Sequence, residues 1–379
     1  MKSARLSAGL GAVLALAASR PAPAQSVSLP PSGANQKASV TQSIGLVKVT
    51  VDYSSPRVHY QGQDRTGKIW GQLVPYGLHD LGFNDCKQCP WRAGANENTV
   101  ITVSHDVKVE GKPLPAGSYG LHMIAGKEAF TVIFSKSSKS WGSYWYDPKE
   151  DALRVEVKPV ASEFREWLTY EFLEREPGKA TLALLWENLK VPVTISLDDP
   201  DAPYFAALRN ELRGYAGFDS PSLQAAAQWA LGTGKNLDEA LGWARRAADT
   251  TTGGEESFAT LSTLGLLESA TGKTAEGEKT LQRAIDHPTA NPIRVHQLGR
   301  QLQAQGKKAE ALKVFEANAK RFPDKWPVHV GLARGYAGTG DTKKALEHAK
   351  KALAQAPDEL NRKNLEKMVE QLQKGEGPK

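Results

Sequence analysis

The segment Trp91-Arg92-Ala93-Gly94-Ala95-Asn96-Glu97 places an aromatic ring, a fixed cation, an amide and a carboxylate within seven residues. A forked Arg92–Glu97 ion pair, supported by Asn96, would shape a polar pocket. His79 and His122 would add acid–base capacity if the fold brings them to this loop. The same groups can instead hydrogen-bond buried backbone and lock the loop, and we favour this structural interpretation. We therefore assign no catalytic residue.

Cys86 and Cys89 are the only cysteines of the chain and are separated by two residues. This spacing is compatible with thiol redox chemistry or with half of a metal site. A metal site would need two further ligands, and His79, His105 and His122 do not follow a known ligand spacing. In an exported chain a local disulfide is the simpler outcome, and we predict it, with no metal bound.

A third candidate site occupies equivalent positions of a repeat in the second half of the chain. Arg300 and Arg334 lie 34 residues apart, and His296 precedes Arg300 by one helical turn. Arginine binds carboxylates through two parallel hydrogen bonds, so this stripe is suited to an acidic peptide or a C-terminal carboxylate. An ordinary solvated helix face is the competing interpretation.

The composition excludes several classes of function. The formal net charge is +6, and it falls to about +3 without residues 1–24, so neither half has the basic excess of a nucleic-acid-binding domain. The chain contains no Gly-x-Ser-x-Gly elbow, no phosphate-binding loop and no dinucleotide-binding glycine cluster. We therefore expect no cofactor.

Residues 1–24 have the three parts of a secretory signal peptide. Lys2 and Arg5 precede the apolar stretch Leu6–Ala18, and Ala22-Pro23-Ala24 offers a cleavage site. No later segment approaches 18 consecutive apolar residues, so we expect no stable membrane insertion after cleavage. The sequence thus predicts export to the periplasm or the medium.

Residues 37–197 alternate apolar and polar side chains with a period of two. In the first clear strand, Val47, Val49 and Val51 alternate with Lys48, Thr50 and Asp52. About eight or nine short strands separated by turn signals predict a β-sandwich or jelly-roll-like domain. Six of the nine tryptophans lie here, and we expect most of them in the core rather than on an exposed sugar-binding platform: Trp70, Trp91, Trp141, Trp145, Trp167 and Trp186.

Residues 198–221 read as a linker with a short helix, and residues 222–373 have the 3.6-residue period of helices. Leu264, Leu298 and Leu332 recur every 34 residues, and the glycines at 272, 306 and 340 recur at the same interval. This region resembles the tetratricopeptide repeat, a helix–turn–helix unit, and predicts a solenoid of about four units. Asp358–Gln373 reads as the terminal helix that covers the last unit.

The first half also carries an ordered series of motifs, namely Tyr53–Pro56, Trp70–Gly77, Trp91–Glu97, Leu114–Leu121, Trp141–Gly142 and Tyr146–Asp147. Together they resemble domain-of-unknown-function family 2911, an exported bacterial domain. The resemblance implies fold and export, and no established activity comes with it.

The leading hypothesis is a non-catalytic interaction or scaffold protein. Its solenoid would bind another exported or envelope protein through an acidic segment, and its β-sandwich would be a second recognition module. One alternative is a cell-envelope enzyme that acts on a saccharide or peptide at the Trp91–Glu97 loop. The other is a thiol redox protein that uses Cys86 and Cys89.

Overall fold

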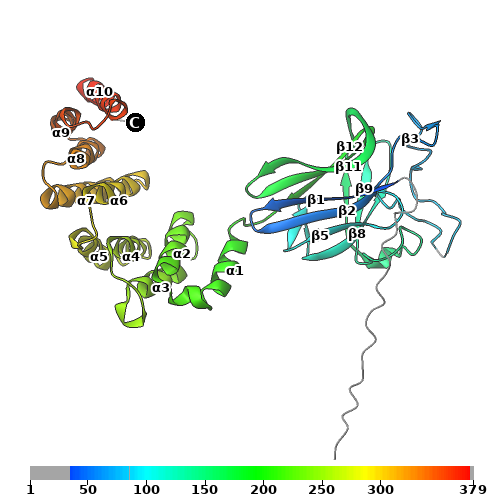
Figure 1. Cartoon of the computed structure of the whole chain (residues 1–379), viewed down its shortest axis with the longest axis horizontal. Coiled ribbons are helices and arrows are strands. Elements are labelled where there is room, and N and C mark those ends of the chain that lie inside the picture. The colour runs from blue at the N-terminus through cyan, green and yellow to red at the C-terminus, as the bar shows by residue number, and fades with distance from the viewer. Residues whose placement is uncertain (1–34, 85, 376–379) are drawn as a thin grey trace, which may run out of the picture. The chain divides into compact units, whose positions relative to one another are not determined.

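The computed structural model describes residues 35–84 and 86–375, so the signal-peptide prediction lies outside the described residues. The chain forms two compact units, and Asp198 ends the first while Asp199 begins the second (Figure 1). The first unit is built from strands and the second from helices.

Two antiparallel sheets form the first unit. The larger has the order β1-β2-β5-β8-β9-β10, from Gln36–Ile44, Val47–Ser55, Thr99–Val103, Gly117–Ile124, Phe130–Ser135 and Asp151–Val157. The smaller has the order β11-β12-β6-β7, from Val160–Glu176, Lys179–Ser196, Val107–Val109 and Lys112–Leu114. A short ribbon joins β3 and β4, His59–Tyr60 and Gln63–Asp64.

The core of this unit lies between the two sheets. The period-two pattern of β2 buries Val47, Val49 and Val51 completely, and these side chains share one cluster with Leu182 and Leu184 of β12. The predicted β-sandwich is confirmed, and neither sheet closes into a barrel within the described residues.

The two strands that end this unit are longer than the sequence pattern predicts. β11 and β12 span 17 and 18 residues, whereas the pattern predicts shorter strands separated by turns. Their pairing shifts register around Arg165, opposite Glu187, whose φ of 54° is left-handed. Such bulges bend a strand without ending it, so polar residues there do not mark a turn.

The second unit consists of helices in series, apart from two 3₁₀ turns, Tyr215–Phe218 and Thr250–Thr252. A further 3₁₀ turn, Pro148–Glu150, belongs to the first unit. The helices α1 to α5 are Ala202–Glu211, Ser220–Thr233, Leu237–Ala248, Phe258–Ala270 and Thr274–Asp286. The helices α6 to α10 are Pro292–Ala304, Lys308–Arg321, Trp326–Thr339, Thr342–Ala354 and Glu359–Gln373.

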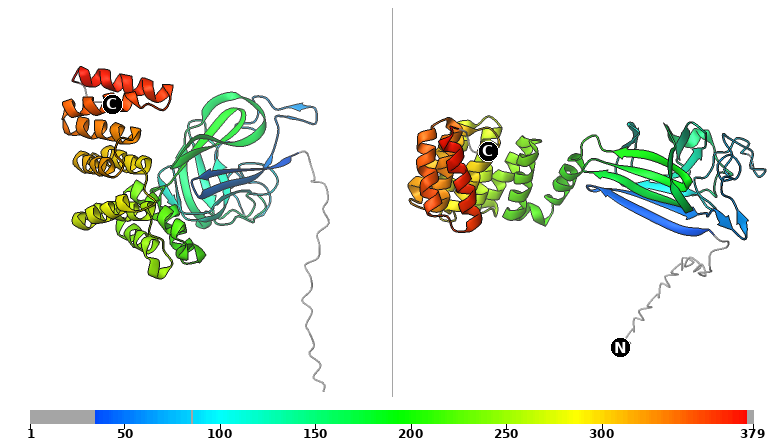
Figure 2. Two further views of the ribbon diagram at one scale, coloured as in Figure 1. Left: turned by 60° about the vertical axis from the view of Figure 1, so that its left-hand side comes forward. Right: turned by 90° about the horizontal axis from the view of Figure 1, so that it is seen from above.

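The spacing of these helices confirms the tetratricopeptide-type arrangement. The first helices of successive pairs, α4, α6 and α8, begin at Phe258, Pro292 and Trp326, each 34 residues after the last. Figure 2 shows the helix pairs stacked one after another. The pairs turn at Gly272, Gly306 and Gly340, each with φ between 78° and 90°, where other residues are strained.

One aromatic side chain sits where three helices meet. The buried ring of Phe315 in α7 lies against Gly299 of α6 and against Gly331 and Gly335 of α8. A Cβ atom at any of these glycines would come closer to the ring than normal van der Waals contact. The absence of three side chains therefore allows α6, α7 and α8 to approach closely.

The last helix, α10, covers the end of the stack. It buries Leu365, Met368 and Leu372 in one cluster with residues of α8 and α9, and the carboxylate of Asp358 caps its first turn. No helix in the part of the chain that the structure describes has both the length and the apolar character needed to cross a bilayer.

The Phe315 contact predicts opposite effects of the same substitution at two glycines. Gly299→Ala should lower the free energy of unfolding by about 1–3 kcal/mol, because the new methyl group overlaps the Phe315 ring. Gly242→Ala, in α3 with open space around the added Cβ, should raise it by about 0.5–1 kcal/mol. Urea unfolding followed by circular dichroism measures both, and equal effects at the two positions would contradict the packing argument.

Candidate functional site

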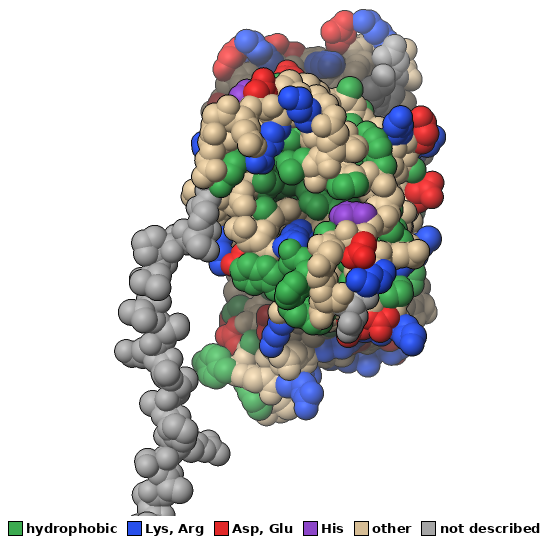
Figure 3. Space-filling view, turned by 90° about the vertical axis from the view of Figure 1, so that its right-hand side faces the viewer, with side chains coloured by type: hydrophobic (Ala, Val, Ile, Leu, Met, Phe, Trp, Pro, Cys, Tyr) green, Lys and Arg blue, Asp and Glu red, His purple; other side chains and the backbone are tan. Residues whose placement is uncertain are grey.

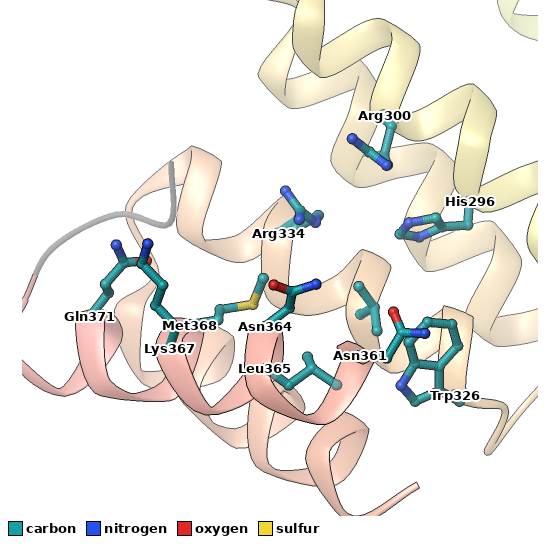
Figure 4. A pocket seen from close by; sticks show the side chains of 11 residues that line it. His296, Arg300, Trp326, Arg334, Asn361, Asn364, Leu365, Lys367, Met368 and Gln371 are labelled. Atoms are coloured by element: carbon teal, nitrogen blue, oxygen red, sulfur yellow. The ribbon is translucent and has the colours of Figure 1, made fainter. Parts of the chain in front are cut away.

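The predicted residues His296, Arg300 and Arg334 line one hollow, which we call the arginine groove. It lies between α6, α8 and α10, has a volume of about 440 Å³, and is lined by His296, Arg300, Trp326, Val330, Arg334, Asn361, Asn364, Leu365, Lys367, Met368 and Gln371. Arg300 and Arg334 point into the same space from α6 and α8, and Asn361 and Asn364 reach toward it from α10 (Figure 4). The repeat spacing thus brings the two arginines together as predicted.

A neighbouring hollow of about 420 Å³ extends the arginine groove. It shares Arg300 and Arg334 and adds Gln303 and Lys308, together with small residues. The linings of the two hollows contain four cations, including Lys367, and no aspartate or glutamate. Among the described residues, none of the four cations forms an ion pair. The groove is therefore a positive surface without its own counter-charge.

Burial and mutual repulsion shape the charges of the groove. Burial, followed by repulsion from Arg300, lowers the pKa of the half-buried Arg334. Burial, followed by the charges of Arg334 and Arg300, lowers the pKa of His296 to about 4. His296 is thus neutral at pH 7, and the positive charge there comes from the arginines and lysines.

Two buried N–H groups at the groove have no acceptor within the described residues. They are Nε of Arg334 and Nε1 of the Trp326 indole. Buried donors are normally paired, so two unpaired donors beside a surplus of positive charge indicate a place for an acceptor-rich anion.

The contribution of α10 to the groove is not among the predicted site residues. Asn361, Asn364, Lys367 and Gln371 lie on one stripe of the helix, beside the buried stripe of Leu365, Met368 and Leu372. The signal was present in the sequence, because these polar residues recur every three or four positions. A terminal helix read only as a cover for the stack hides this second role.

The structure places the Trp91–Glu97 segment against the core of the β-sandwich. The indole of Trp91 packs edge-on to Trp70, with ring centroids 5.7 Å apart, and stacks on buried Trp186 at 6.2 Å. The backbone of Trp91 exchanges two hydrogen bonds of 2.8 Å with Met123. The hydroxyl groups of Thr99 and Tyr170 both donate to the carbonyl oxygen of Ala93.

Arg92 and Glu97 are not paired with each other. The guanidinium of Arg92 donates to the carbonyl oxygen of Asn96 and lies over the Tyr144 ring. The Glu97 carboxylate accepts from Ser54 at 3.1 Å and pairs with Lys37 at 3.0 Å. Left-handed turns at Ala93 and Asn96, with φ of 50° and 57°, separate the two side chains. These contacts match the structural interpretation of the loop.

The two histidines considered for acid–base chemistry lie in different surroundings. His122 is buried, and a hydrogen bond of 2.9 Å joins its Nδ1 to Oγ of Ser143. Its ring also packs edge-on to Tyr146, whose hydroxyl donates to Asp151. Burial, followed by the charge of Arg92, lowers the pKa of His122 to about 4. Sequence reasoning missed this Ser143–Tyr146–Asp151 network, because its members lie on separate strands and loops.

His79 instead belongs to the segment that carries the cysteines, and it pairs through its backbone with Cys89. Cys86 and Cys89 are both buried, and their sulfur atoms are adjacent. Their pairing as a disulfide stays a prediction. Within residues 35–84 and 86–375, no three histidine, cysteine, aspartate or glutamate side chains gather as a metal site would require.

Comparison with known families gives a match for the first unit. Residues 35–195 match the family described as Protein of unknown function (DUF2911). The match covers the two sheets of the β-sandwich and ends before the helices begin. The resemblance inferred from the ordered motifs of the first half is thereby confirmed. Comparison with curated proteins found no match for the chain.

The helical unit is similar to two solved structures. One is YrrB, described as a TPR protein with an unusual peptide-binding site, at 20% identity over 44% of this chain and 86% of YrrB, with a TM-score of 0.28. The other is a mutant of MamA, at 16% identity over 41% of this chain and 86% of MamA, with a TM-score of 0.25.

The prediction for the cysteines concerns the purified protein without its signal peptide. Cys86 and Cys89 should be joined, because their sulfur atoms are adjacent and an oxidising compartment favours the disulfide. Thiol titration under denaturing, non-reducing conditions should find no free sulfhydryl. Two titratable thiols per chain would contradict the prediction.

The His122 environment predicts a specific loss of stability in acid. The unfolded chain binds a proton on this imidazole near pH 6.5, whereas the folded DUF2911 unit does so only near pH 4. The free energy of unfolding should therefore fall by up to about 3 kcal/mol as the pH drops through this window. His122→Gln should flatten the pH dependence of the β-sandwich transition in urea, with His105→Gln as the control at an exposed histidine. An unchanged slope in His122→Gln would contradict the assignment.

Proposed function

We propose that the protein is a non-catalytic interaction protein that binds an acidic peptide segment in the arginine groove. The observation that supports this most directly is the charge of the lining, which has four cations and no acid. Carboxylate groups of a ligand would supply the missing counter-charge. They would also supply oxygen acceptors for the unpaired donors of Arg334 and Trp326.

The residues of the groove suit a peptide better than a small metabolite. The amides of Asn361, Asn364 and Gln371 can each donate to a backbone carbonyl and accept from a backbone N–H. The apolar side chains of Val330, Leu365 and Met368 line the same space. A hollow of about 440 Å³ holds a few side chains and leaves the rest of a partner outside.

The two arginines should contribute unequally to binding. Arg334 is half-buried, so its hydrogen bonds with a carboxylate are shielded from solvent and contribute about 1.5–3 kcal/mol. Arg300 is exposed, and an exposed ion pair contributes less than about 1 kcal/mol. Recognition should therefore depend most on Arg334, while Arg300 raises the local positive potential.

The partner belongs to the compartment in which the protein acts. The signal-like residues 1–24 support a periplasmic or secreted location. We accordingly propose that the acidic segment belongs to another exported or envelope protein. The β-sandwich then has room for a separate role as the second recognition module.

The test compares defined peptides on the full chain lacking residues 1–24. Fluorescence polarisation would measure the affinity for a labelled oligoglutamate peptide, for its amidated form and for an oligoglutamine peptide. Arg300→Ala/Arg334→Ala should weaken binding of oligoglutamate by about tenfold or more, and Arg334→Ala alone should account for most of the loss. Added salt should weaken binding by wild type.

Arg245→Ala/Arg362→Ala is the matched control, because it removes two exposed arginines outside the groove. A difference between the free and the amidated peptide would distinguish recognition of a terminal carboxylate from recognition of acidic side chains. Equal affinities of wild type and the groove variant for oligoglutamate would contradict the proposal, as would equal binding of oligoglutamine.

A further inference from the structure

The DUF2911 unit carries an unusual concentration of exposed aromatic side chains. Phe83, Trp141 and Trp145 are 60%, 51% and 53% exposed. Fully exposed aromatic rings are costly in water, and several on neighbouring loops mark a binding surface. Figure 3 shows hydrophobic side chains gathered around a hollow on one face of the molecule.

Direct contacts join these rings across two loops. Phe83 packs edge-on to Tyr144 at 5.3 Å and to Trp145 at 6.3 Å between ring centroids. Tyr144 and Trp145 pack edge-on to each other at 6.2 Å. We call Phe83, Trp141, Tyr144 and Trp145 the aromatic patch. Because its contacting rings meet at steep angles, the exposed part of each ring faces a different direction.

The surroundings hold the aromatic patch in place. The guanidinium of Arg92 lies 4.9 Å from the centre of the Tyr144 ring, and Asn84 donates to the carbonyl oxygen of Tyr144 at 3.3 Å. Arg92 is in turn fixed by its hydrogen bond to Asn96. The motif residue Arg92 therefore supports the patch from below. A preformed surface loses little conformational freedom when a ligand binds.

The charges near the aromatic patch favour a neutral ligand. Lys87 pairs with Asp80 at 3.3 Å, and Lys127 lies over the Tyr76 ring. Arg92 is engaged as described. These cations already have partners, so they offer little attraction to an anionic lipid surface or an acidic peptide. Asp80, Lys87 and Asn84 nevertheless supply polar atoms beside the rings, where hydroxyl groups of a ligand can form hydrogen bonds.

We propose that the aromatic patch binds a neutral saccharide chain. One face of a pyranose ring presents C–H groups that carry partial positive charge, and an aromatic face carries partial negative charge. Sugar rings would stack on the exposed faces of Trp145 and Phe83, with their hydroxyl groups turned toward the neighbouring polar side chains. The proposal concerns a different unit from the arginine groove and does not depend on peptide binding there.

The test measures binding of soluble oligosaccharides to the full chain lacking residues 1–24. The probes are the tetramers of β-1,4-linked N-acetylglucosamine, β-1,4-linked glucose and α-1,4-linked glucose, followed by calorimetry and tryptophan fluorescence. At least one tetramer should bind. Trp145→Ala and Phe83→Ala should each weaken its affinity about tenfold, and Trp145→Phe should restore part of the loss.

Phe164→Ala is the matched control, because Phe164 is 45% exposed on β11 and outside the patch. Circular dichroism would show that the variants remain folded, as expected for side chains that are more than half exposed. Failure of every tetramer to bind would overturn the proposal, and so would an affinity unchanged in Trp145→Ala/Phe83→Ala. Binding of phosphatidylcholine vesicles through the same two residues, without saccharide binding, would identify a lipid surface instead and also overturn it.

Discussion

The contact of Phe315 with three glycines sets how closely α6, α7 and α8 can stack. Gly299 immediately precedes Arg300, and Gly335 immediately follows Arg334. The close approach that these glycines permit therefore also fixes the two arginines on neighbouring helices around one hollow. Side chains at the glycines would push α6 and α8 away from α7, and the groove would lose its shape before it lost its charge. Packing in the core and geometry of the site are in this sense one constraint.

That constraint has an electrostatic cost. Two guanidinium groups are held close enough for Arg300 to lower the pKa of Arg334, and burial lowers it further. Within the described residues no carboxylate relieves the repulsion, although the same helices supply glutamates elsewhere, such as Glu278, which pairs with Lys313. Folding alone does not require such an arrangement, because most charged side chains can avoid burial. An anion in the groove would turn the repulsion into attraction and would satisfy the unpaired donors as well.

The sequence predicted what depends on periodicity and missed what depends on how distant segments meet. The 34-residue spacing was enough to place Arg300 and Arg334 together, because equivalent repeat positions face the same way. The role of α10 was missed, since its polar stripe gains meaning only when it lies opposite α6 and α8. Arg92 and Glu97 are close in sequence, yet left-handed turns at Ala93 and Asn96 direct them to different partners. The exposure of Trp141 and Trp145 was equally hidden, because composition cannot distinguish a core tryptophan from one on a loop.

The two polar constellations of the chain differ in whether they are satisfied internally. In the Trp91–Glu97 loop, Arg92, Asn96 and Glu97 all have partners within the protein: the Asn96 carbonyl and Tyr144 for Arg92, Asn35 for the Asn96 side chain, and Ser54 and Lys37 for Glu97. The loop's polar groups are therefore spent on structure, and its outward effect is to support the aromatic patch through Arg92. In the arginine groove the cations and two buried donors lack partners. Because folded proteins pair nearly all buried polar groups, unpaired groups that share one hollow indicate a ligand, whereas paired groups indicate a scaffold. The same rule assigns the loop to structure and the groove to recognition.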